Sequence, residues 1–542
     1  MNRRQFLITA SGAFIQTLYP GIVLAGTTPR KAPYRLVYSN DLTNITTCVS
    51  PWHKKGEEFR PEMLTASVAE VADSGVDAHF FQPGLGWTTL WQSKVYPPKQ
   101  HYDWLKSTYG MGPDTFGRSV LEGHDLIQVF VDSCRRYGQA AVISFRLNDG
   151  HHKEFVNASP GSKISSGASM GLSEFYCAHP EYRIGPSTTD WGQRVQNWAI
   201  PAVRDHKLAF ITEICENYDI DGLELDFMRN YSYFRLNETT SDERAGIMTQ
   251  FVATVRKLLD RTARHGRHRW LSLRIPGYIN VCDALGIDPS AVNAAGAEIL
   301  NVSASYFTSQ QTELAAIRKL APEAVLLDEM THVVWNGPPI SSAPDARQDR
   351  RTTQEEFYTT ADWAYSAGAD GISLFNFPYY REYGEAFRGP FSEPPFGVLP
   401  HLKNRHWLSE QPQHYFLSPG WSSPFRRSDF PKKAEPNRPL AISFDLVPIS
   451  GGWKKGGRLR IQTTAPIPAG QWQASINGTD LQPTPDTSEP YPNPYTQLLG
   501  TPDQLRAWDV SPQMVKAGCN DVEIVWHGQG AQKIAFADLA LM

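Results

Sequence analysis

Residues 218–230 read Tyr-Asp-Ile-Asp-Gly-Leu-Glu-Leu-Asp-Phe-Met-Arg-Asn, a short apolar run that carries two acidic residues, Glu224 and Asp226. Successive side chains of a β-strand point to opposite faces, so these two acids share one face and the leucines between them face the other way. Burying a carboxylate without a partner is unfavourable, so the pair needs either an ion pair, for example with Arg229, or a chemical role. The stretch predicts a buried strand that brings two carboxylates into the interior of the protein.

The segments around this stretch alternate between short apolar strands and amphipathic helices. Eight such strands, joined to helices mostly by short links, predict a (β/α)8 barrel over residues 34–410. The competing fold is an open doubly wound sheet, but the first strand is not followed by the Gly-rich turn of a dinucleotide site. The predicted strands are Arg35–Asp41, Val76–Gln82, Gln139–Arg146, Ile220–Phe227, Arg269–Ile275, Ile299–Ser305, Ala324–Glu329 and Asp370–Phe377.

Helical patterns lie between these strands, and several have recognisable ends. Ser241 is the expected N-terminal cap of the longest helix, with Glu243 in its first turn. A long loop rich in Trp and Tyr is expected after the second strand, and another long loop follows the third strand to about residue 197. The predicted helices are Pro61–Ser74, Glu122–Tyr137, Ile200–Asn217, Ser241–His265, Pro289–Gly296, Gln310–Leu320 and Thr353–Ala367.

The chain after the barrel has a different composition. Residues 411–438 are rich in Pro, Ser, Arg and Lys and predict a linker. Residues 439–542 then show short alternating runs separated by turn residues, with no long helix between them. This pattern predicts a smaller all-β domain, a sandwich or jelly roll, after the α/β barrel.

The composition excludes several functional classes. The formal net charge is −4 over 542 residues, so no basic surface indicates nucleic-acid binding. After the N-terminus, no segment approaches the ~20 apolar residues that a membrane span needs. The six cysteines form no C-x-x-C pair and no zinc spacing, so we predict neither a metal nor another cofactor. The 15 Trp, 22 Tyr and 26 Phe suit sugar stacking, although large cores use them too.

The N-terminus has the features of an export signal. Residues 2–7 read Asn-Arg-Arg-Gln-Phe-Leu, and a weakly hydrophobic segment follows that ends in Val-Leu-Ala at residues 23–25. Paired arginines before Phe-Leu resemble a twin-arginine signal, whose route carries folded proteins across the inner bacterial membrane. We expect residues 1–25 to be removed and the mature protein to be periplasmic or secreted, with no membrane attachment.

Polar side chains follow nearly every predicted barrel strand. Active sites of such barrels lie at the carboxyl ends of the strands, so these side chains define the expected site. Asp226 and Glu329 are expected to oppose each other across the barrel mouth, with Glu224 one layer deeper. Alternation lets only one of Asp328 and Glu329 face the mouth, and the position of Glu329 at the strand's end favours it. The residues expected to contact substrate are Arg146, Asn148, Asp149, His151, His152, Arg274, Tyr306, His332, Asn376 and Trp87.

Carboxylates from different strands, with Arg, Asn, His and aromatic neighbours, suit cleavage of a glycosidic bond. One carboxyl group acts as the acid while the other is nucleophile or base. We expect Asp226 to be the nucleophile or base and Glu329 the acid, with Glu224 as the second candidate for either role. Arg146 and Arg274 either hold an acid ionised, bind a carboxylate or sulfate on the sugar, or form structural ion pairs.

The adjacent histidines allow a second interpretation. His151 and His152 are metal-ligand types and lie close to Asp149, but a bare pair of neighbouring histidines has no chelating geometry by itself. We therefore predict that they bind substrate rather than a metal.

Four motifs resemble glycoside-hydrolase-like TIM barrels. Residues 219–229 resemble their fourth strand, in which an Asp-Gly-Ile-x-Leu-Asp-Tyr-x-Arg pattern follows a helix. The second Asp of that pattern is the expected catalytic carboxylate, so the resemblance implies this role for Asp226. Residues 200–205 (Ile-Pro-Ala-Val-Arg-Asp), 274–277 (Arg-Ile-Pro-Gly) and 368–376 (Gly-Ala-Asp-Gly-Ile-Ser-Leu-Phe-Asn) resemble a helix start, the fifth strand and the eighth strand of this family.

The sequence departs from the family in two places. Glu224 stands where the family often has His, Gln or another polar residue. The chitinase-type pattern Asp-Gly-x-Asp-x-Asp-x-Glu fails because Met228 occupies the position of its catalytic Glu, which disfavours substrate-assisted cleavage.

The C-terminal part of the chain carries a further resemblance. Residues 508–520 look like part of the accessory β-domains of carbohydrate-active enzymes.

The sequence thus predicts an exported glycoside hydrolase that acts on a poly- or oligosaccharide, including acidic or sulfated ones. One alternative is a polysaccharide lyase, in which the arginines bind a uronate carboxylate and His or Tyr is the base. The other is a non-catalytic protein that binds glycan on a barrel scaffold.

Overall fold

The computed structural model describes residues 32–151, 153, 156, 168–335, 349–381, 393–419, 430–468, 470–493 and 500–541. The predicted signal peptide and His152 lie outside these residues. In the described part of the chain, no helix is both long and apolar enough to cross a membrane. None of the six cysteines takes part in a disulfide.

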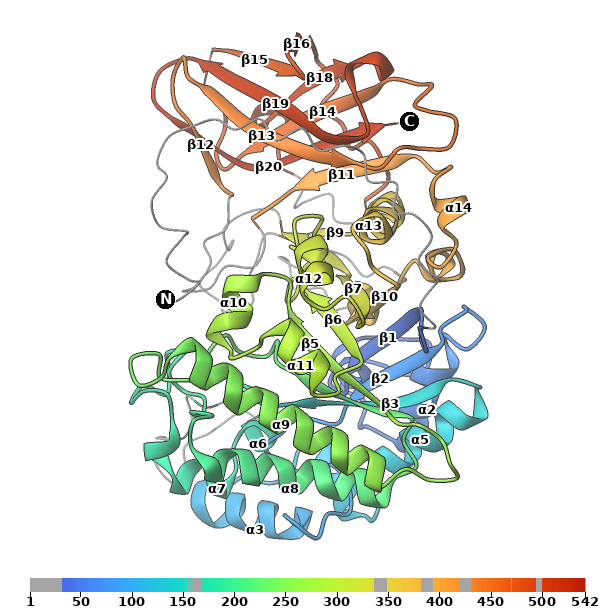
Figure 1. Ribbon diagram of the computed structural model, residues 1–542, viewed down its shortest axis with the longest axis vertical. Helices are drawn as coiled ribbons and strands as arrows, with labels where there is room; N and C mark the ends of the chain where they lie inside the picture. Colours follow the sequence, from blue (N-terminus) through green and yellow to red (C-terminus); the bar gives the residue numbers. More distant parts are fainter. Residues whose placement is uncertain are drawn as a thin grey trace, which may run out of the picture.

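Eight parallel strands close into a barrel, as the sequence predicted, so the open doubly wound sheet is excluded (Figure 1). Each strand pairs with its neighbours in chain order, and β1 closes the barrel against β10. The strands are β1 (Leu36–Asp41), β2 (Ala78–Gln82), β3 (Ala140–Arg146), β4 (Gly222–Asp226), β5 (Trp270–Pro276), β6 (Ile299–Ser303), β7 (Val325–Thr331) and β10 (Gly371–Phe375).

The barrel interior changes from apolar to polar along the strands. An apolar cluster that includes Val37, Phe80, Val142 and Leu327 comes from the amino-terminal halves of the strands. At the same level β4 has Gly222, where a Cβ atom would lie 2.7 Å from the carbonyl oxygen of Trp270. Glycine is therefore required there for close strand packing. Towards the carboxyl ends the interior positions are polar.

Helices cover the outside of the barrel and mostly match the predicted segments. The longest, α9 (Ser241–Arg261), is capped by Thr240, not by Ser241 as predicted: the Thr240 hydroxyl accepts from the Glu243 amide and the Glu243 carboxylate accepts from the Thr240 amide. Ser241 does not fit a capping box with Glu243, because the acid of that motif lies three positions after the cap, as Glu243 does after Thr240. The other covering helices are α2 (Pro61–Ala69), α5 (Leu126–Arg136), α8 (Pro201–Asn217), α11 (Pro289–Ala294), α12 (Leu314–Leu320) and α13 (Gln354–Ser366).

The loops at the carboxyl ends contain further elements that the sequence did not predict. The aromatic loop after β2 folds into α3 (Pro98–Tyr109) and α4 (Thr115–Leu121). Helix α3 starts at a proline and ends at Gly110, whose φ is 67°. These two signals of helix ends were missed in the sequence. The remaining short elements are α1 (Asn44–Thr47), α6 (Ala168–Gly171), α7 (Glu174–Ala178), η2 (Pro180–Tyr182), α10 (Ile279–Ala284), β8 (Val333–Trp335), β9 (Asp349–Arg351), η3 (Phe377–Arg381), η4 (Phe396–His401) and α14 (Arg405–Leu408).

The C-terminal part forms a β-sandwich, as predicted, with a core that includes Trp508 and Trp526. One sheet contains β11 (Gln413–Leu417), β20 (Gln532–Leu541), β14 (Gly457–Thr463), β18 (Leu505–Val510) and β17 (Gln482–Thr484), with β12 (Lys432–Ala434) paired to β20. The other contains β13 (Pro439–Leu446), β19 (Gly518–His527), β15 (Gln471–Ile476) and β16 (Thr479–Asp480). Two short 3₁₀ turns, η6 (Pro502–Gln504) and η7 (Pro512–Met514), flank β18.

The segment predicted to be a linker supplies two of these strands. Both β11 and β12, within residues 411–438, pair antiparallel with β20, so in its described residues this segment belongs to the sandwich. Figure 1 shows β11 lying against α13, between the sandwich and the barrel. The high Pro, Ser and Lys content around these short strands concealed their apolar alternation.

Candidate active site

Asp226 lies at the carboxyl end of β4, fully buried and held by three groups. Its carboxylate accepts hydrogen bonds from Gln82 Nε2 at 2.6 Å, from the Met228 amide at 2.8 Å and from Arg274 Nη1 at 3.2 Å. Strand register explains this arrangement, because Asp226 pairs with Arg146 on β3 and with Arg274 on β5. The donors surround both oxygens, so the carboxylate is held in one orientation.

Glu329 on β7 completes an Asp–Arg–Glu chain across the barrel. Arg274 donates to both of its oxygens at 2.6 Å, and the Ser303 hydroxyl donates to one of them at 2.6 Å. Burial by itself lowers the pKa of Arg274, but Glu329 and Asp226 raise it above its usual range. Glu329 therefore faces the interior, as expected, whereas Asp328 points to the other face, where no described group donates to its carboxylate.

Glu224 lies one layer deeper on the same face of β4. It accepts from Ser144 at 2.7 Å and from Ser272 and Asn301 at 3.1 Å, and no arginine donates a hydrogen bond to it. Burial raises its pKa from 4.5 to about 7, and the negative charge of Asp226 adds to the shift. Two carboxyl groups two residues apart thus have different partners, hydroxyl and amide groups for Glu224 and an arginine for Asp226.

A second ion-pair cluster lies beside the first, at the ends of β1 and β3. Arg146 bonds to Asp41, to Asp149 at 2.8 Å and to the Gln82 amide oxygen at 2.9 Å. Burial would raise the pKa of Asp41, but Arg146 and Arg229 hold it at about 2. Arg229 is the loosest member, with its nearest carboxylate oxygens 3.7 and 3.8 Å away and its side chain 12% exposed.

His151 extends this cluster towards solvent. Its Nδ1 lies 2.8 Å from the Asp149 carboxylate, and its side chain is 38% exposed, whereas Asp149 is fully buried. Burial would raise the pKa of Asp149, but His151 and Arg146 hold it well below its usual range. In the described part of the chain, no cluster of His, Cys, Asp and Glu is arranged to hold a metal ion.

The rim of the mouth carries aromatic rings and strained backbone. Tyr306 and Tyr379 pack on His332, each with ring centroids 5.3 Å away. Ser305 and Asn376 have φ angles of 68° and 53°, in the left-handed region that favours glycine. Such strain concentrates at functional sites. The Asn376 side chain donates to Asp41 at 3.2 Å, and the Ser305 carbonyl accepts from Arg274 at 3.3 Å, so both strained residues anchor the ion-pair clusters.

Two of the predicted substrate contacts have their side chains engaged by the protein itself. Trp87 is fully buried: its Nε1 donates to the Asp149 carbonyl at 3.0 Å, and Lys207 and Lys153 lie 3.6 and 4.2 Å from the ring centroid. The Asn148 side chain donates to the backbone carbonyls of Gln196 and Ser232 in two loops. Alternation alone could not show these contacts, because each residue follows the end of its strand.

Three site residues were not in the predicted set. Gln82 and Asp41 end their strands, so their position in the sequence was the available signal. Arg229 was considered only as a partner of Glu224 or Asp226, but it faces Asp41 and Asp149 instead. The remaining predicted residues, apart from His152, lie together at the carboxyl ends of the strands.

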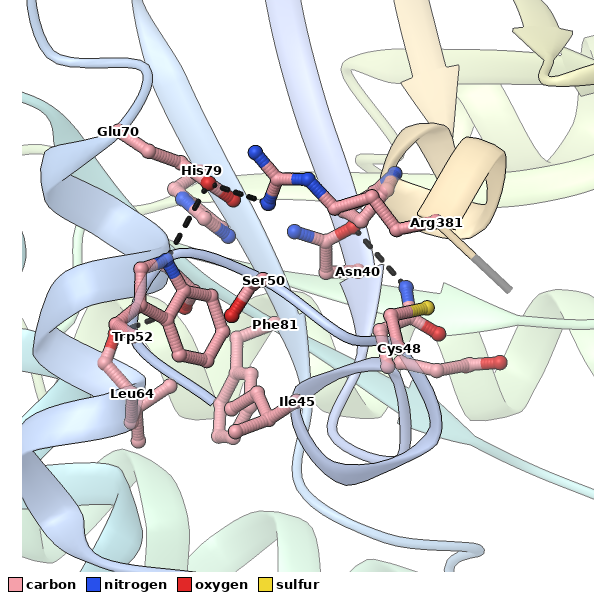
Figure 2. Close-up of a pocket in the computed structure, with 14 residues that line it drawn as sticks. Asn40, Ile45, Cys48, Ser50, Trp52, Leu64, Glu70, His79, Phe81 and Arg381 are labelled. Carbon is pink, nitrogen blue, oxygen red and sulfur yellow. Dashed lines mark hydrogen bonds and ion pairs between the residues drawn. The ribbon is translucent and has the colours of Figure 1, made fainter. Parts of the chain in front are cut away.

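A small cavity lies on the outer side of β1 and β2, between them and α2 (Figure 2). Glu70 accepts from Arg381 at 2.8 Å and from Trp52 at 3.4 Å, which ties α2 to the segment after β10. His79 lines this cavity rather than the barrel interior, and burial lowers its pKa to about 3. His79 is therefore a neutral core residue.

The fold and the site define a (β/α)8 barrel whose mouth is lined with ion-paired carboxylates. No protein-family model matches the chain. A stretch of 176 residues, 32% of this chain, is 24% identical to the Escherichia coli (strain K12) protein named Glycosyl hydrolase DigH. The chain spans about a third of the length of this relative, 36%.

Solved structures with similar folds include two sugar-cleaving enzymes by name. α-L-Fucosidase isoenzyme 2 from Paenibacillus thiaminolyticus matches 69% of this chain and 49% of its own, with 10% identity and a TM-score of 0.40. The PgaB (BpsB) glycoside hydrolase domain from Bordetella bronchiseptica matches 66% of this chain and 99% of its own, with 12% identity and a TM-score of 0.40.

Proposed function

We propose that the protein is a glycoside hydrolase that cleaves a poly- or oligosaccharide at the barrel mouth. The observation that carries this proposal is the pair Asp226 and Glu224, an arginine-bonded carboxylate and a carboxyl group whose pKa is about 7. Glycosidases need two carboxyl groups whose environments separate their protonation states. The similarity to the protein named Glycosyl hydrolase DigH supports the same activity.

In this proposal Asp226 is the nucleophile or the base. Arg274 and Gln82 hold and orient its carboxylate, and the arginine ion pair with Glu329 fixes Arg274 in turn. Glu224 is the carboxyl group that carries the proton. Glu329 suits the role of acid less well than predicted, because Arg274 donates to both of its oxygens, whereas the described donors to Glu224 are hydroxyl and amide groups.

Two of the three arginines at the mouth argue against a site built for anionic sugars. Arg146 and Arg274 spend their donors on Asp41, Asp149, Asp226 and Glu329, so neither is available to a uronate or sulfate. The lyase mechanism needs a cation to neutralise the uronate carboxylate, and of these three arginines only the loosely paired Arg229 could supply it, which favours hydrolysis. We further propose that the protein is exported by the twin-arginine signal in residues 1–25 and acts outside the cytoplasm.

The test is a screen of the mature protein against neutral and anionic polysaccharides, scored for reducing ends and for ultraviolet absorbance together. A hydrolase releases reducing ends without a new absorbance. Absorbance from an unsaturated product would establish the lyase alternative. Binding without any new reducing end, on every polysaccharide that binds, would establish the non-catalytic alternative.

A further inference from the structure

A groove of about 660 Å³ runs beside the candidate active site. Its walls are residues 180–193, from the loop after β3, and residues 231–238, from the loop after β4. Both loops leave the carboxyl ends of neighbouring strands. The groove therefore opens at the same end of the barrel as Asp226 and is not part of the ion-pair clusters.

The groove is close to the candidate catalytic carboxylate. Tyr231, which lines it, follows Asp226 by five positions, a distance of at most about 17 Å even for a fully extended chain. Between them, Asn230 donates to the Trp191 carbonyl at 2.7 Å, and the Trp191 ring packs against His151 with centroids 5.1 Å apart. The mouth and the groove are therefore close enough for one glycan chain to reach both.

Side-chain hydrogen bonds to backbone carbonyl groups hold the two walls in place. Arg235 donates to the carbonyl groups of Glu181, Arg183 and Ile184 at 2.7, 2.6 and 3.2 Å, which joins one wall to the other. Asn148, at the end of β3, donates to the carbonyls of Gln196 and Ser232 at 2.9 Å and accepts from the Gln196 amide at 3.1 Å. Such a preformed groove binds without a large ordering cost.

The lining combines the groups that recognise sugars. Tyr231 is half-buried against Gly192, where a Cβ atom would lie 3.0 Å from its ring, so glycine makes room for the ring. An aromatic ring presents an apolar face to sugar C–H groups and a polar hydroxyl at its edge. The groove is also lined by side chains of the types that exchange hydrogen bonds with sugar hydroxyl groups, namely amides and carboxylates: Asp190, Gln193, Asn237 and Glu238.

The charges of the groove favour an uncharged ligand. Arg235 directs its donors at backbone carbonyls and Glu238, and Arg183 stacks over the Tyr176 ring, 4.7 Å from its centroid. The other charged lining residues, Asp190 and Glu238, are acidic. The exposed charges of the lining are therefore the carboxylates of Asp190 and Glu238, which repel a uronate or a sulfated sugar.

We propose that this groove is a sugar-binding subsite that holds an uncharged residue of the same glycan chain that is cleaved at Asp226. The proposal rests on the proposed glycosidase function and extends it, because it specifies a neutral polysaccharide long enough to reach beyond the mouth. Asn148 is then a positioning residue of the subsite.

The test measures binding of the full mature chain to a glycan array that carries xylan, β-glucan, mannan, polygalacturonate and heparan sulfate. All proteins carry Asp226→Asn, so that the glycans are not degraded. The added variants are Tyr231→Ala, which removes the ring, Asn237→Trp, which fills the groove from an exposed position, and Tyr231→Phe as the matched control. Thermal unfolding of each variant checks that it is folded.

We expect binding to a neutral glycan that weakens about 10-fold in Tyr231→Ala and in Asn237→Trp and is retained in Tyr231→Phe. Unchanged binding in folded Tyr231→Ala and Asn237→Trp would overturn the subsite, as would binding to the anionic glycans alone or to none. Reducing-end release by the wild-type protein separates the two proposals. Release with unaltered variant binding sinks the subsite alone, and Tyr231-dependent binding without release sinks the hydrolase alone.

Discussion

At the scale of single residues, the two carboxyl groups that β4 places inside the barrel have different neighbours. Asp226 lies in a layer with two arginines, and Glu224 lies in the layer below, among hydroxyl and amide groups. The sequence predicted that both face inwards. It could not predict their protonation, because that depends on which residues β2, β3, β5 and β6 place beside them.

Asp226→Asn should lower the rate of glycan hydrolysis by at least ~3 orders of magnitude, because a catalytic carboxylate supplies several kcal/mol of transition-state stabilisation. The measurement is kcat/KM for reducing-end release on the polysaccharide found in the screen. Asp132→Asn, an exposed acid on α5, is the matched control and should retain wild-type turnover. Near-wild-type turnover in Asp226→Asn would remove it from the mechanism.

Glu224→Gln should change how stability depends on pH. The pKa of Glu224 is 4.5 in the unfolded chain and about 7 in the folded protein. Between these values the folded protein keeps a proton that the unfolded chain has lost, so the stabilising contribution is present below 4.5 and is lost as the pH rises through about 7. Chemical denaturation at pH 4.5 and 8 should therefore show the wild type losing roughly 3 kcal/mol relative to Glu224→Gln.

Parallel pH profiles for the two proteins would contradict this assignment of the proton. The same proton should control activity. Hydrolysis by the wild type is expected to decline as the pH rises through about 7, because Glu224 then becomes charged.

At the scale of elements, strand alternation was the most dependable guide. It placed Glu329 rather than Asp328 inside the barrel, and it grouped Ser144 with Arg146 on one face of β3. Signals at element ends were less dependable. Asn148 follows the end of β3, where the period of two no longer holds, so its side chain reaches loop backbone instead of substrate.

Thr240→Ala tests the corrected cap of α9. The substitution removes the hydroxyl that accepts from the Glu243 amide, so the free energy of unfolding should fall by about 1 kcal/mol. Thr254→Ala is the control, since Thr254 is exposed in the middle of the same helix and bonds only to the Gln250 carbonyl. It should change stability by less than about 0.5 kcal/mol in the same urea titration. Equal losses in both variants would show that Thr240 does not act as the cap.

At the scale of the whole molecule, a buried charge network joins the sandwich to the barrel. His414 on β11 lies 2.9 Å from Asp538 of the sandwich and 3.6 Å from Glu356 of α13. Arg460 donates to both Asp538 and Glu489, and Glu489 also pairs with Arg350 beside the barrel. The predicted linker therefore begins with a buried strand, β11, that fixes one domain to the other.

Asp538→Asn should lower the free energy of unfolding by roughly 3 kcal/mol, because Arg460 and His414 lose a buried partner. Burial would raise the pKa of Asp538, but Arg460 and His414 lower it below its ordinary 3.8. Its contribution is therefore present above that value and is lost as the pH falls further.

Asp486→Asn is the control for this experiment. Asp486 pairs with Arg458 in the same sandwich but is 59% exposed, so its loss should change stability by less than about 0.5 kcal/mol. Guanidinium denaturation at pH 7 compares the two variants. Equal stability of Asp538→Asn and the wild type would mean that the network does not hold the domains together.

The sequence by itself determined the barrel, the sandwich and the face on which the carboxylates lie. These features follow from local periodicity, which is 2 for a strand and 3.6 for a helix and is written in neighbouring residues. Only the tertiary structure decided which arginine pairs with which acid, that burial raises the pKa of Glu224, that Trp87 is buried, and that the loops after β3 and β4 enclose a groove. Each of these depends on residues far apart in the chain that barrel closure brings within hydrogen-bond distance, and on the desolvation that follows from their burial.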